Sequence, residues 1–392
     1  MGLDRSYRGL RVLDLSENIA GPLACMIFGD LGADVVKVER RMVGDSTRSL
    51  PPRQHDNSTV FLTVNRNKRS VELDLASEAG RAAVMAIAKN VDVVVESFRP
   101  GVADKLGLGY EDFLSVKPDM IYCSISAFGR GPHGHDRPGY DALVQAFTGI
   151  MALTGQPDER PSRAAPSLID ISTGMWAAMS IMAALAARAQ GEEGPHKLES
   201  TLIDSGMFMM CHQIVGLLGA DFHPERLGSA APSTAPYKEY TTADGSIMIA
   251  AATDRLFRRT CAVLEADHLA DDPRYRTVDD RVAHRDELDA DLEKILSTRP
   301  SAHWLDAIAA AGVPVGPVNS LEDALAHPLT HERELIADVQ GTPLVRLPFD
   351  QLRNFALSQP PALGAHTEEV LREVGYGPED ISAFVSHERD SE

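Results

Sequence analysis

Residues 10–39 read LRVLDLSENIAGPLACMIFGDLGADVVKVE, and this stretch decides the fold class. Leu10–Leu15 is typical of a buried strand, Gly21–Leu31 of an amphipathic helix, and Asp34–Glu39 of a second strand. Two strands joined by a helix predict a parallel βαβ unit. The turn after the first strand carries one glycine, Gly21, and lacks the G-x-G-x-x-G run of dinucleotide-binding folds. The stretch therefore predicts a Rossmann-like α/β fold without a nicotinamide site.

The alternation of strands and helices continues over the first 150 residues. We expect further strands at Ser70–Leu75, Val91–Glu96 and Met120–Ile125, and helices at Ser77–Lys89 and Tyr140–Leu153. This order predicts a doubly wound parallel sheet. A long, almost uncharged helix near residues 172–190 is expected to be buried on most faces.

The length of the chain, 392 residues, exceeds one ordinary core and predicts two domains. Residues 221–236 contain three prolines and no periodicity, as in a linker, and Tyr237–Ala251 has the pattern of a hairpin turning at Asp244-Gly245. The expected boundaries are a large domain at 1–200, a linker at 201–236, a smaller α+β domain at 237–320 and a C-terminal segment at 321–392.

Composition excludes several classes of function. With 38 Lys and Arg against 57 Asp and Glu, the net charge of −19 argues against a general nucleic-acid-binding protein. The four cysteines form no C-x-x-C pair, which argues against a disulfide framework or a zinc site and favours the cytoplasm. No apolar run is expected to reach the ~18–20 residues that span a bilayer, so we expect no membrane contact.

Basic residues gather in three short groups despite the acidic background. Lys37, Arg40 and Arg41 follow the second expected strand, residues 65–70 read NRNKRS, and Arg99 and Lys105 follow the Val91–Glu96 strand. Ligands of doubly wound sheets bind at the carboxyl ends of the strands. The first and third groups therefore suit a phosphate-rich ligand, or else they are solvated surface charges.

Asp170 lies where a short apolar run meets the long uncharged helix, and it has two interpretations. The first is a first-turn acid held by backbone N–H groups and the helix dipole. The second is a nucleophile or an acid/base group in a partly desolvated pocket.

The chain resembles the class III coenzyme A transferases, a family related to the α-methylacyl-CoA racemases. The matching motifs run in order over nearly the whole chain: Val12-Leu-Asp-Leu, Ala20-Gly-Pro22, the 31–39 segment, Gly44-Asp45, Arg48, the 65–70 segment, Leu73-Asp74, Phe98-Arg-Pro-Gly101, Leu106-Gly-Leu-Gly-Tyr110, Gly139-Tyr-Asp141, Gln145-Ala146, Gly149, Thr154-Gly155, Asp170, Asp244-Gly245 and Gly312-Val-Pro-x-Gly-Pro317. The resemblance implies two interlocked copies in a homodimer and a C-terminal segment that returns to the large domain.

The resemblance also implies how the site works. Asp170 falls on the nucleophile that forms an acyl anhydride and then an aspartyl-CoA thioester, with coenzyme A as the acyl-CoA substrate and no metal. Ala20 lies where the backbone approaches the reacting carbonyl, and Tyr140 matches an aromatic residue near the nucleophile. The remaining positions implied to bind CoA are Asn18, Ile19, Arg41, Leu73, Ala76, Ser97, Phe98 and Lys105. Ser97 departs from the family, where asparagine is usual.

Two other functions stay open at this point. A racemase needs a second acid/base group opposite Asp170, and the matching context Gly139-Tyr140-Asp141 lacks the usual histidine, while His133 and His135 lie in a polar loop. A non-catalytic CoA-binding homologue is the third alternative, and the presence of Asp170 argues against it. We therefore expect transfer of CoA to a small carboxylic acid that the sequence does not identify.

Overall fold

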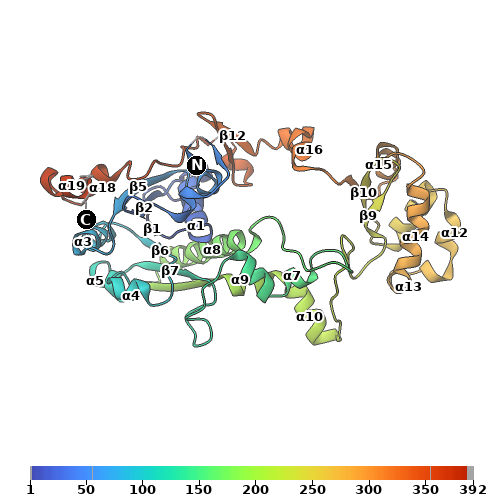
Figure 1. Cartoon of the computed structure of the whole chain (residues 1–392), viewed down its shortest axis with the longest axis horizontal. Helices are drawn as coiled ribbons and strands as arrows, with labels where there is room; N and C mark the ends of the chain where they lie inside the picture. Colours follow the sequence, from blue (N-terminus) through green and yellow to red (C-terminus); the bar gives the residue numbers. More distant parts are fainter. Residues whose placement is uncertain (1, 55, 354, 386–392) are drawn as a thin grey trace. The chain divides into compact units, whose positions relative to one another are not determined.

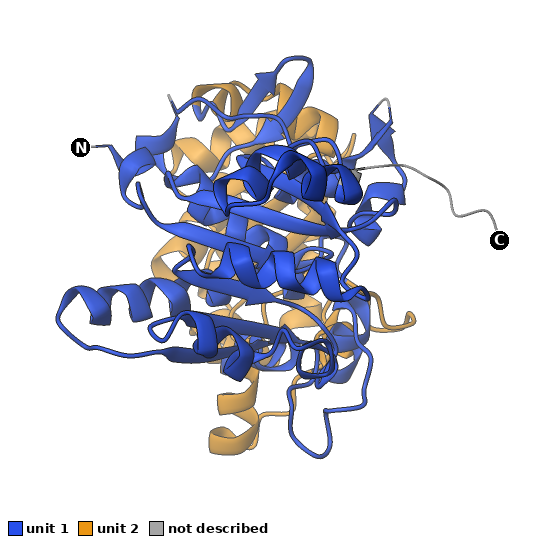
Figure 2. Cartoon of the chain, turned by 90° about the vertical axis from the view of Figure 1, so that its left-hand side faces the viewer, with its two compact units in different colours: residues 1–148, 164–211, 333–392 blue, residues 149–163, 212–332 orange. Residues whose placement is uncertain are grey.

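The computed structural model describes residues 2–54, 56–353 and 355–385. The chain divides into two compact units (Figure 2). Unit 1 comprises residues 1–148, 164–211 and 333–392, and unit 2 comprises residues 149–163 and 212–332. Each unit is described by itself below.

Unit 1 is built on a six-stranded parallel sheet (Figure 1). Its strands, in spatial order, are β5 Lys68–Leu73, β2 Asp34–Arg40, β1 Arg11–Leu15, β6 Val93–Glu96, β7 Ile121–Ser126 and β8 His196–Thr201. Numbered along the chain this order is 3-2-1-4-5-6, the doubly wound arrangement in which the chain changes direction between β1 and β6. The predicted α/β class and parallel sheet are confirmed.

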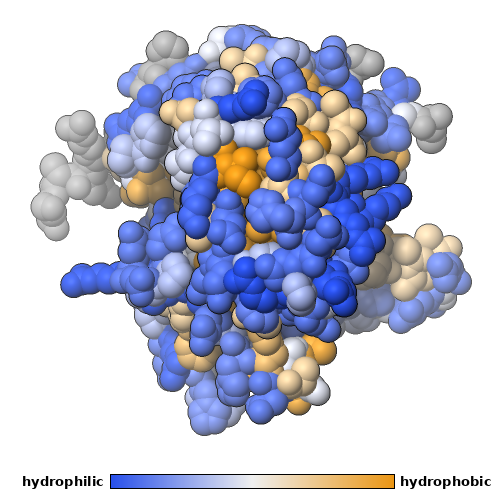
Figure 3. Space-filling model, turned by 90° about the vertical axis from the view of Figure 1, so that its right-hand side faces the viewer, coloured by the Kyte–Doolittle hydropathy of each residue, from blue (hydrophilic) through white to orange (hydrophobic). Residues whose placement is uncertain are grey.

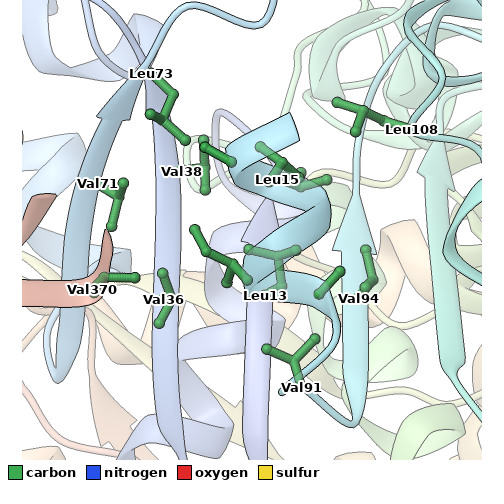
Figure 4. Packing of buried hydrophobic residues seen from close by; sticks show 14 of the residues in the cluster. Leu13, Leu15, Val36, Val38, Val71, Leu73, Val91, Val94, Leu108 and Val370 are labelled. Atoms are coloured by element: carbon green, nitrogen blue, oxygen red, sulfur yellow. The ribbon is translucent and has the colours of Figure 1, made fainter. Parts of the chain in front are cut away.

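Alternate residues of the central strands build the core on one face of the sheet. Leu13 and Leu15 of β1 and Val36 and Val38 of β2 are buried in one cluster with Val370 of α18 (Figure 4). The helices that contribute to this cluster are α3 Glu78–Ala88, α5 Tyr110–Val116, α18 Thr367–Glu373 and α19 Pro378–Val385. Short helices α2 Thr59–Val64 and α4 Val102–Leu106 and strands β12 Ile336–Val339 and β13 Thr342–Val345 complete this part of the unit.

Helices α1 Ala20–Asp30 and α8 Leu168–Ala189 pack against each other and against strands of the same sheet. The sequence predicted no apolar run long enough to span a bilayer, and α8 shows that this was wrong: by length and composition it meets that requirement. Its packing against α1, β7, β8 and α9 Leu202–Met209 also makes it a core helix of unit 1. Large apolar side chains remain exposed along it: Ile171, Met175, Trp176 and Met179.

Two segments differ from the expectation, and the first of them passes from unit 1 into unit 2 along the chain. The helix predicted at Tyr140–Leu153 is two helices, α6 Asp141–Phe147 and α7 Ile150–Leu153, because Gly149 takes a left-handed conformation with φ of 88° and breaks the run. Strand β8 was missed because its sequence, His-Lys-Leu-Glu-Ser-Thr, is polar and the strand lies at the edge of the sheet.

Unit 2 contains the predicted hairpin, formed by β9 Tyr237–Thr241 and β10 Ser246–Ala250, with β11 Val315–Pro317 pairing antiparallel to β10. The principal helices are α10 Cys211–Ala220, α11 Asp254–Val263, α12 Asp267–Asp271, α13 Val278–Ala283, α14 Arg285–Leu296, α15 Ser301–Ala310, α16 Leu321–Ala326 and α17 Pro328–Glu332. Tyr240, Ile247 and Ile249 of the sheet pack against Phe257 and Trp304. The face shown in Figure 3 is predominantly hydrophilic, in keeping with the net charge of −19.

The boundaries expected from the sequence for the linker and the C-terminal segment differ from those of the structure. The segment expected to be a linker, 201–236, holds α9 and α10 before its irregular part begins at residue 221. The final part of the chain joins unit 1 from Arg333 onward. There the backbone N–H of His366 donates to the carbonyl oxygen of Ser70 (2.9 Å), and Arg69 forms an ion pair with Glu373 (2.7 Å).

Candidate active site

A cavity of about 300 Å³ opens at the carboxyl ends of β1, β6 and β7 in unit 1. Its walls include residues 17–21, which run from the loop after β1 into the first turn of α1, and residues 97–100 of the loop after β6. Residues 125–127 at the end of β7, Tyr140 and Asp170 also line it. The cavity therefore lies where the strand order reverses, which is the place where doubly wound sheets bind their ligands.

Asp170 is the third residue of α8 and lines this cavity, with only 8% of its surface exposed. Its backbone N–H and that of Ile169 donate to Oδ2 of Asp141, over 3.2 and 2.8 Å. Asp141 thus takes up the helix-capping role that one interpretation of the sequence gave to Asp170. Within the described part of the chain, the Asp170 side chain forms no hydrogen bond, so its carboxylate is available for chemistry.

The environment of Asp170 disfavours its charge. Burial is the larger cause and the neighbouring charge of Asp141 the second, and together they raise the pKa of Asp170 to about 7. A carboxyl group without a compensating cation in a desolvated site behaves in this way. At neutral pH the side chain is close to half ionised, and a carboxylate with a high pKa is a more basic nucleophile than an ordinary aspartate.

Asp141 was not among the predicted site residues, although it belongs to the Gly139-Tyr140-Asp141 motif. It is 5% exposed, and its Oδ1 accepts a hydrogen bond of 2.6 Å from Nε2 of Gln145. The Gln145 side chain in turn accepts from the backbone N–H of Ala164 over 2.9 Å. The motif signalled a functional position, but the contact to α8 spans 29 residues and sequence spacing does not reveal it.

Most of the predicted site residues come together in the cavity. Ala20, Asn18, Ile19, Ser97, Phe98 and Tyr140 all line it with Asp170. Tyr140 precedes α6 and is 65% exposed. Ser97 joins two of the loops, because its Oγ accepts a hydrogen bond of 2.9 Å from the backbone N–H of Glu17. Arg99, from the basic group expected after the Val91–Glu96 strand, also lines this cavity, and so does Arg137, which the sequence did not signal.

Four predicted CoA-binding residues lie elsewhere in unit 1. Arg41 and Leu73 line a second cavity of about 290 Å³, next to Tyr376 and Phe384 of the C-terminal segment. Ala76 follows Leu73 closely, and its backbone N–H donates to Oδ1 of Asp74. Lys105 is exposed in the last turn of α4 and lines neither cavity.

The interpretation of the first basic group as phosphate ligands or solvated surface charges is wrong for Lys37, and two members of the 65–70 group are buried as well. Lys37 and Lys68 are fully buried in ion pairs with Asp45 (2.9 Å) and Asp14 (2.8 Å), respectively. Arg66 is equally buried and pairs with Asp30. These side chains are therefore structural, and a solvated ligand does not reach them.

Neither His133 nor His135 is among the residues that line the cavity with Asp170. The His135 ring is instead 3.0 Å from Oδ1 of Asp136, an exposed neighbour. Among the residues that the structure describes, no group of three or more His, Cys, Asp or Glu side chains is arranged to hold a metal ion.

Comparison with known proteins adds to this geometry. The family model described as CoA-transferase family III matches residues 7–367. Succinyl-CoA:glutarate CoA-transferase from Mus musculus is 37% identical over 379 residues, covering 94% of this chain and 86% of the relative. Acetyl-CoA:oxalate CoA-transferase from Acetobacter aceti is 40% identical over 337 residues, covering 86% of each. The crystal structure of a CAIB/BAIF family protein from Brucella suis is similar with a TM-score of 0.82 and 35% identity, covering 94% of this chain and 98% of that one.

Proposed function

This chain belongs to CoA-transferase family III, and on that premise we propose that it moves CoA from an acyl-CoA to a carboxylic acid through covalent intermediates on Asp170. The observation that carries the proposal is the position of Asp170. Its carboxylate lines the cavity at the reversal of the strand order, it is buried, and its helix is capped by another residue, Asp141.

The first half of the reaction forms and then exchanges an anhydride. An ionised oxygen of Asp170 attacks the thioester carbonyl carbon, the C–S bond breaks, and CoA leaves as a thiolate with a mixed anhydride on the enzyme. The thiolate then attacks the aspartyl carbonyl carbon, releasing the donor acid as its carboxylate and leaving an aspartyl-CoA thioester. Burial of the site strengthens its interactions with the developing oxyanions and keeps water from hydrolysing the anhydride.

The acceptor acid repeats these steps in reverse. Its carboxylate displaces the thiolate from the aspartyl thioester, and the thiolate attacks the acceptor's acyl carbon to give the new acyl-CoA. One oxygen of the acceptor remains on Asp170 at the end of the cycle. The first half needs Asp170 ionised, because its carboxylate is the nucleophile, so activity should rise as pH increases through its pKa of about 7.

Small dicarboxylic acids are the acceptor class that we propose. The two curated relatives described above carry glutarate and oxalate in their names. Arg99 and Arg137 line the same cavity as Asp170 and add positive charge for anionic substrates. A panel of mono- and dicarboxylic acids, with succinyl-CoA or acetyl-CoA as donor and mass spectrometry of the product CoA esters, tests this choice.

Isotope transfer tests the covalent mechanism directly. With an ¹⁸O-labelled acceptor acid, the peptide containing Asp170 should gain one ¹⁸O, and hydroxylamine added during turnover should convert Asp170 to a hydroxamate. Asp170→Asn and Asp170→Ala should lose transfer while still binding CoA. Full transfer by Asp170→Ala, or an unlabelled Asp170 in an active enzyme, would contradict the mechanism.

The proposal includes an interlocked homodimer in the cytoplasm. Supporting it, α8 and α9 of unit 1 expose apolar side chains, and the rings of Trp176 and Phe208 contact each other edge to face with centroids 4.8 Å apart. A second copy that covers these residues would remove them from water. Because interlocked chains must partly unfold to separate, sedimentation should show twice 42.4 kDa even at nanomolar concentration. A monomer–dimer equilibrium would exclude interlocking. Cell fractionation tests the proposed cytoplasmic location.

A further inference from the structure

We propose that four buried charged residues beneath the cavity, Asp14, Lys37, Asp45 and Lys68, position the loop after β1 against the helix that carries Asp170. We call these four residues the buried charge network. Asp14 lies in β1, Lys37 in the middle of β2, Asp45 in the turn that follows β2 and Lys68 at the start of β5, and the mechanism assigns them no role. The inference rests on the proposed function, because it concerns the geometry in which Asp170 meets the thioester.

All four side chains of the buried charge network are closed off from solvent. Lys37 lies 2.9 Å from Asp45 and 3.9 Å from Asp14, and Lys68 lies 2.8 Å from Asp14. Removing four charges from water carries a desolvation penalty of several kcal/mol per ion, and apolar residues of similar volume often give equal or greater stability. A gain in stability is therefore a weak explanation for the presence of four buried charges. The other contacts of the buried charge network indicate which part of the backbone it holds in place.

Those remaining contacts go to the loop that lines the cavity. Nζ of Lys37 donates to the carbonyl oxygen of Ser16 over 2.6 Å, and the Ser16 N–H donates to Oδ1 of Asp14 over 3.0 Å. At the far end, Nζ of Lys68 donates to the carbonyl oxygen of Pro22 over 2.8 Å. The network thus holds the backbone on both sides of residues 17–21.

The middle of the loop has a conformation that needs such support. Asn18 has φ of 76°, which costs free energy for a residue with a side chain. Its backbone N–H donates to Oδ1 of Asp45 over 3.3 Å. Gly21 is packed closely as well, since a Cβ there would lie 2.3 Å from Cβ of Ser16.

The same loop touches the helix of the nucleophile. A Cβ on Gly174, one turn beyond Asp170 in α8, would lie 2.6 Å from the carbonyl oxygen of Ala20. Ala20, the residue at which this loop enters α1, is the one that the family resemblance places next to the reacting carbonyl. A displacement of the loop therefore changes the position of Ala20 relative to Asp170, and misplacement by about 1 Å can reduce a rate about 100-fold.

Three charges of the network, those of Asp14, Lys37 and Asp45, are stabilised by their partners, whereas burial lowers the pKa of Lys68. Burial alone would raise the pKa of Asp14, but Lys37 and Lys68 outweigh burial and lower that pKa to about 2. Burial would lower the pKa of Lys37, but Asp14 and Asp45 outweigh it and raise that pKa. Asp14, Lys37 and Asp45 therefore keep their charges while Asp170 itself titrates.

The test neutralises one pair of the network and compares the result with an equally buried pair elsewhere. The double variant Lys37→Met, Asp45→Asn removes one positive and one negative charge, so it leaves the Asp14–Lys68 pair intact and avoids an unpaired buried charge. The control is Asp30→Asn, Arg66→Met, because Arg66 and Asp30 are 1% and 2% exposed and line neither cavity. Melting temperatures, kcat, KM for acyl-CoA and ¹⁸O labelling of Asp170 are measured for both.

We expect both double variants to melt at lower temperature, with kcat/KM at least tenfold lower in the network variant and within twofold of the parent in the control. Labelling of Asp170 should persist in the network variant at the lower rate. Unchanged kinetics in the network variant, or equal losses in both variants, would overturn the positioning role. Absence of the label in the parent enzyme would instead refute the proposed function.

Discussion

Replacing Asp170 by Asn should stabilise the protein while abolishing transfer. Burial and the charge of Asp141 raise the pKa of Asp170 from 3.8 to about 7 in the folded chain. The unfolded state therefore releases this proton at lower pH than the folded state does. As pH rises from about 4 to about 7, the folded state loses stability relative to the unfolded state. Asparagine has nearly the same shape and carries no charge at any pH.

The size of the effect follows from the two pKa values. A difference of one pKa unit corresponds to about 1.4 kcal/mol, so the ionised carboxyl costs about 4 kcal/mol once pH exceeds 7. At pH 4.5 the folded group stays protonated and the pH lies less than one unit above 3.8, so the cost is only about 1 kcal/mol. The stability advantage of Asp170→Asn should thus grow by about 3 kcal/mol between pH 4.5 and pH 8.

Urea unfolding followed by circular dichroism, at one protein concentration and both pH values, measures this difference. The matched control is Asp136→Asn, because that carboxylate is 99% exposed and an exposed charge contributes little. Its effect should not change between the two pH values by more than about 0.5 kcal/mol. An Asp170→Asn advantage that is equal at pH 4.5 and pH 8 would refute the reasoning, since it would mean that Asp170 has an ordinary pKa.

Three further outcomes are expected. Asp141→Asn removes the like charge but keeps an oxygen that accepts from the N–H groups of α8. The acidic limb of the pH profile of kcat/KM should therefore move to lower pH. An unmoved limb would mean that burial alone sets the pKa of Asp170. Gly174→Ala places a methyl group 2.6 Å from the carbonyl oxygen of Ala20 and should lower kcat more than tenfold, whereas Gly219→Ala, with no atom within 4 Å, should leave it unchanged. In D₂O, 2-methylacyl-CoA should gain no deuterium at enzyme levels that transfer CoA, and rapid wash-in without an acceptor acid would point to a racemase.

The sheet could be predicted because its strands are local and strongly patterned. Residues 10–39 contain almost all of the first βαβ unit. The observed ends of β1, α1 and β2 each lie within one residue of the expected ends. Strand β8 could not be predicted in the same way. It pairs with β7 across about 75 residues, and its alternating Lys197 and Glu199 face solvent at the edge of the sheet, so it lacks the apolar signal of a central strand.

The roles of the charged residues were harder to predict because sequence gives charge but not burial. From its place near the end of a strand, Lys37 was expected either to bind a ligand or to be a solvated surface charge. The register puts it opposite Asp14 on β1, and its neighbours along the strand are valines in a buried sheet. A lysine enclosed by valines in a parallel strand is a signal for a buried ion pair, since such strands are covered on both faces.

The site combines two kinds of carboxylate, and the difference between them explains which one can react. Asp14 and Asp45 each lie beside a buried lysine, and those lysines outweigh burial and lower the pKa of both carboxyls. Such carboxylates are held in place and are weak nucleophiles because their charge is already stabilised. Asp170 is the opposite case, because burial and the charge of Asp141 both raise its pKa. Its ionised form is therefore high in free energy, and attack on a thioester relieves this by moving the charge onto the departing thiolate.

A cation placed beside Asp170, for example by Ile19→Lys in the cavity wall, should accordingly lower the pKa of Asp170 and reduce kcat at pH 8, where the parent is already ionised. An unchanged or increased kcat at that pH would contradict this account of its reactivity.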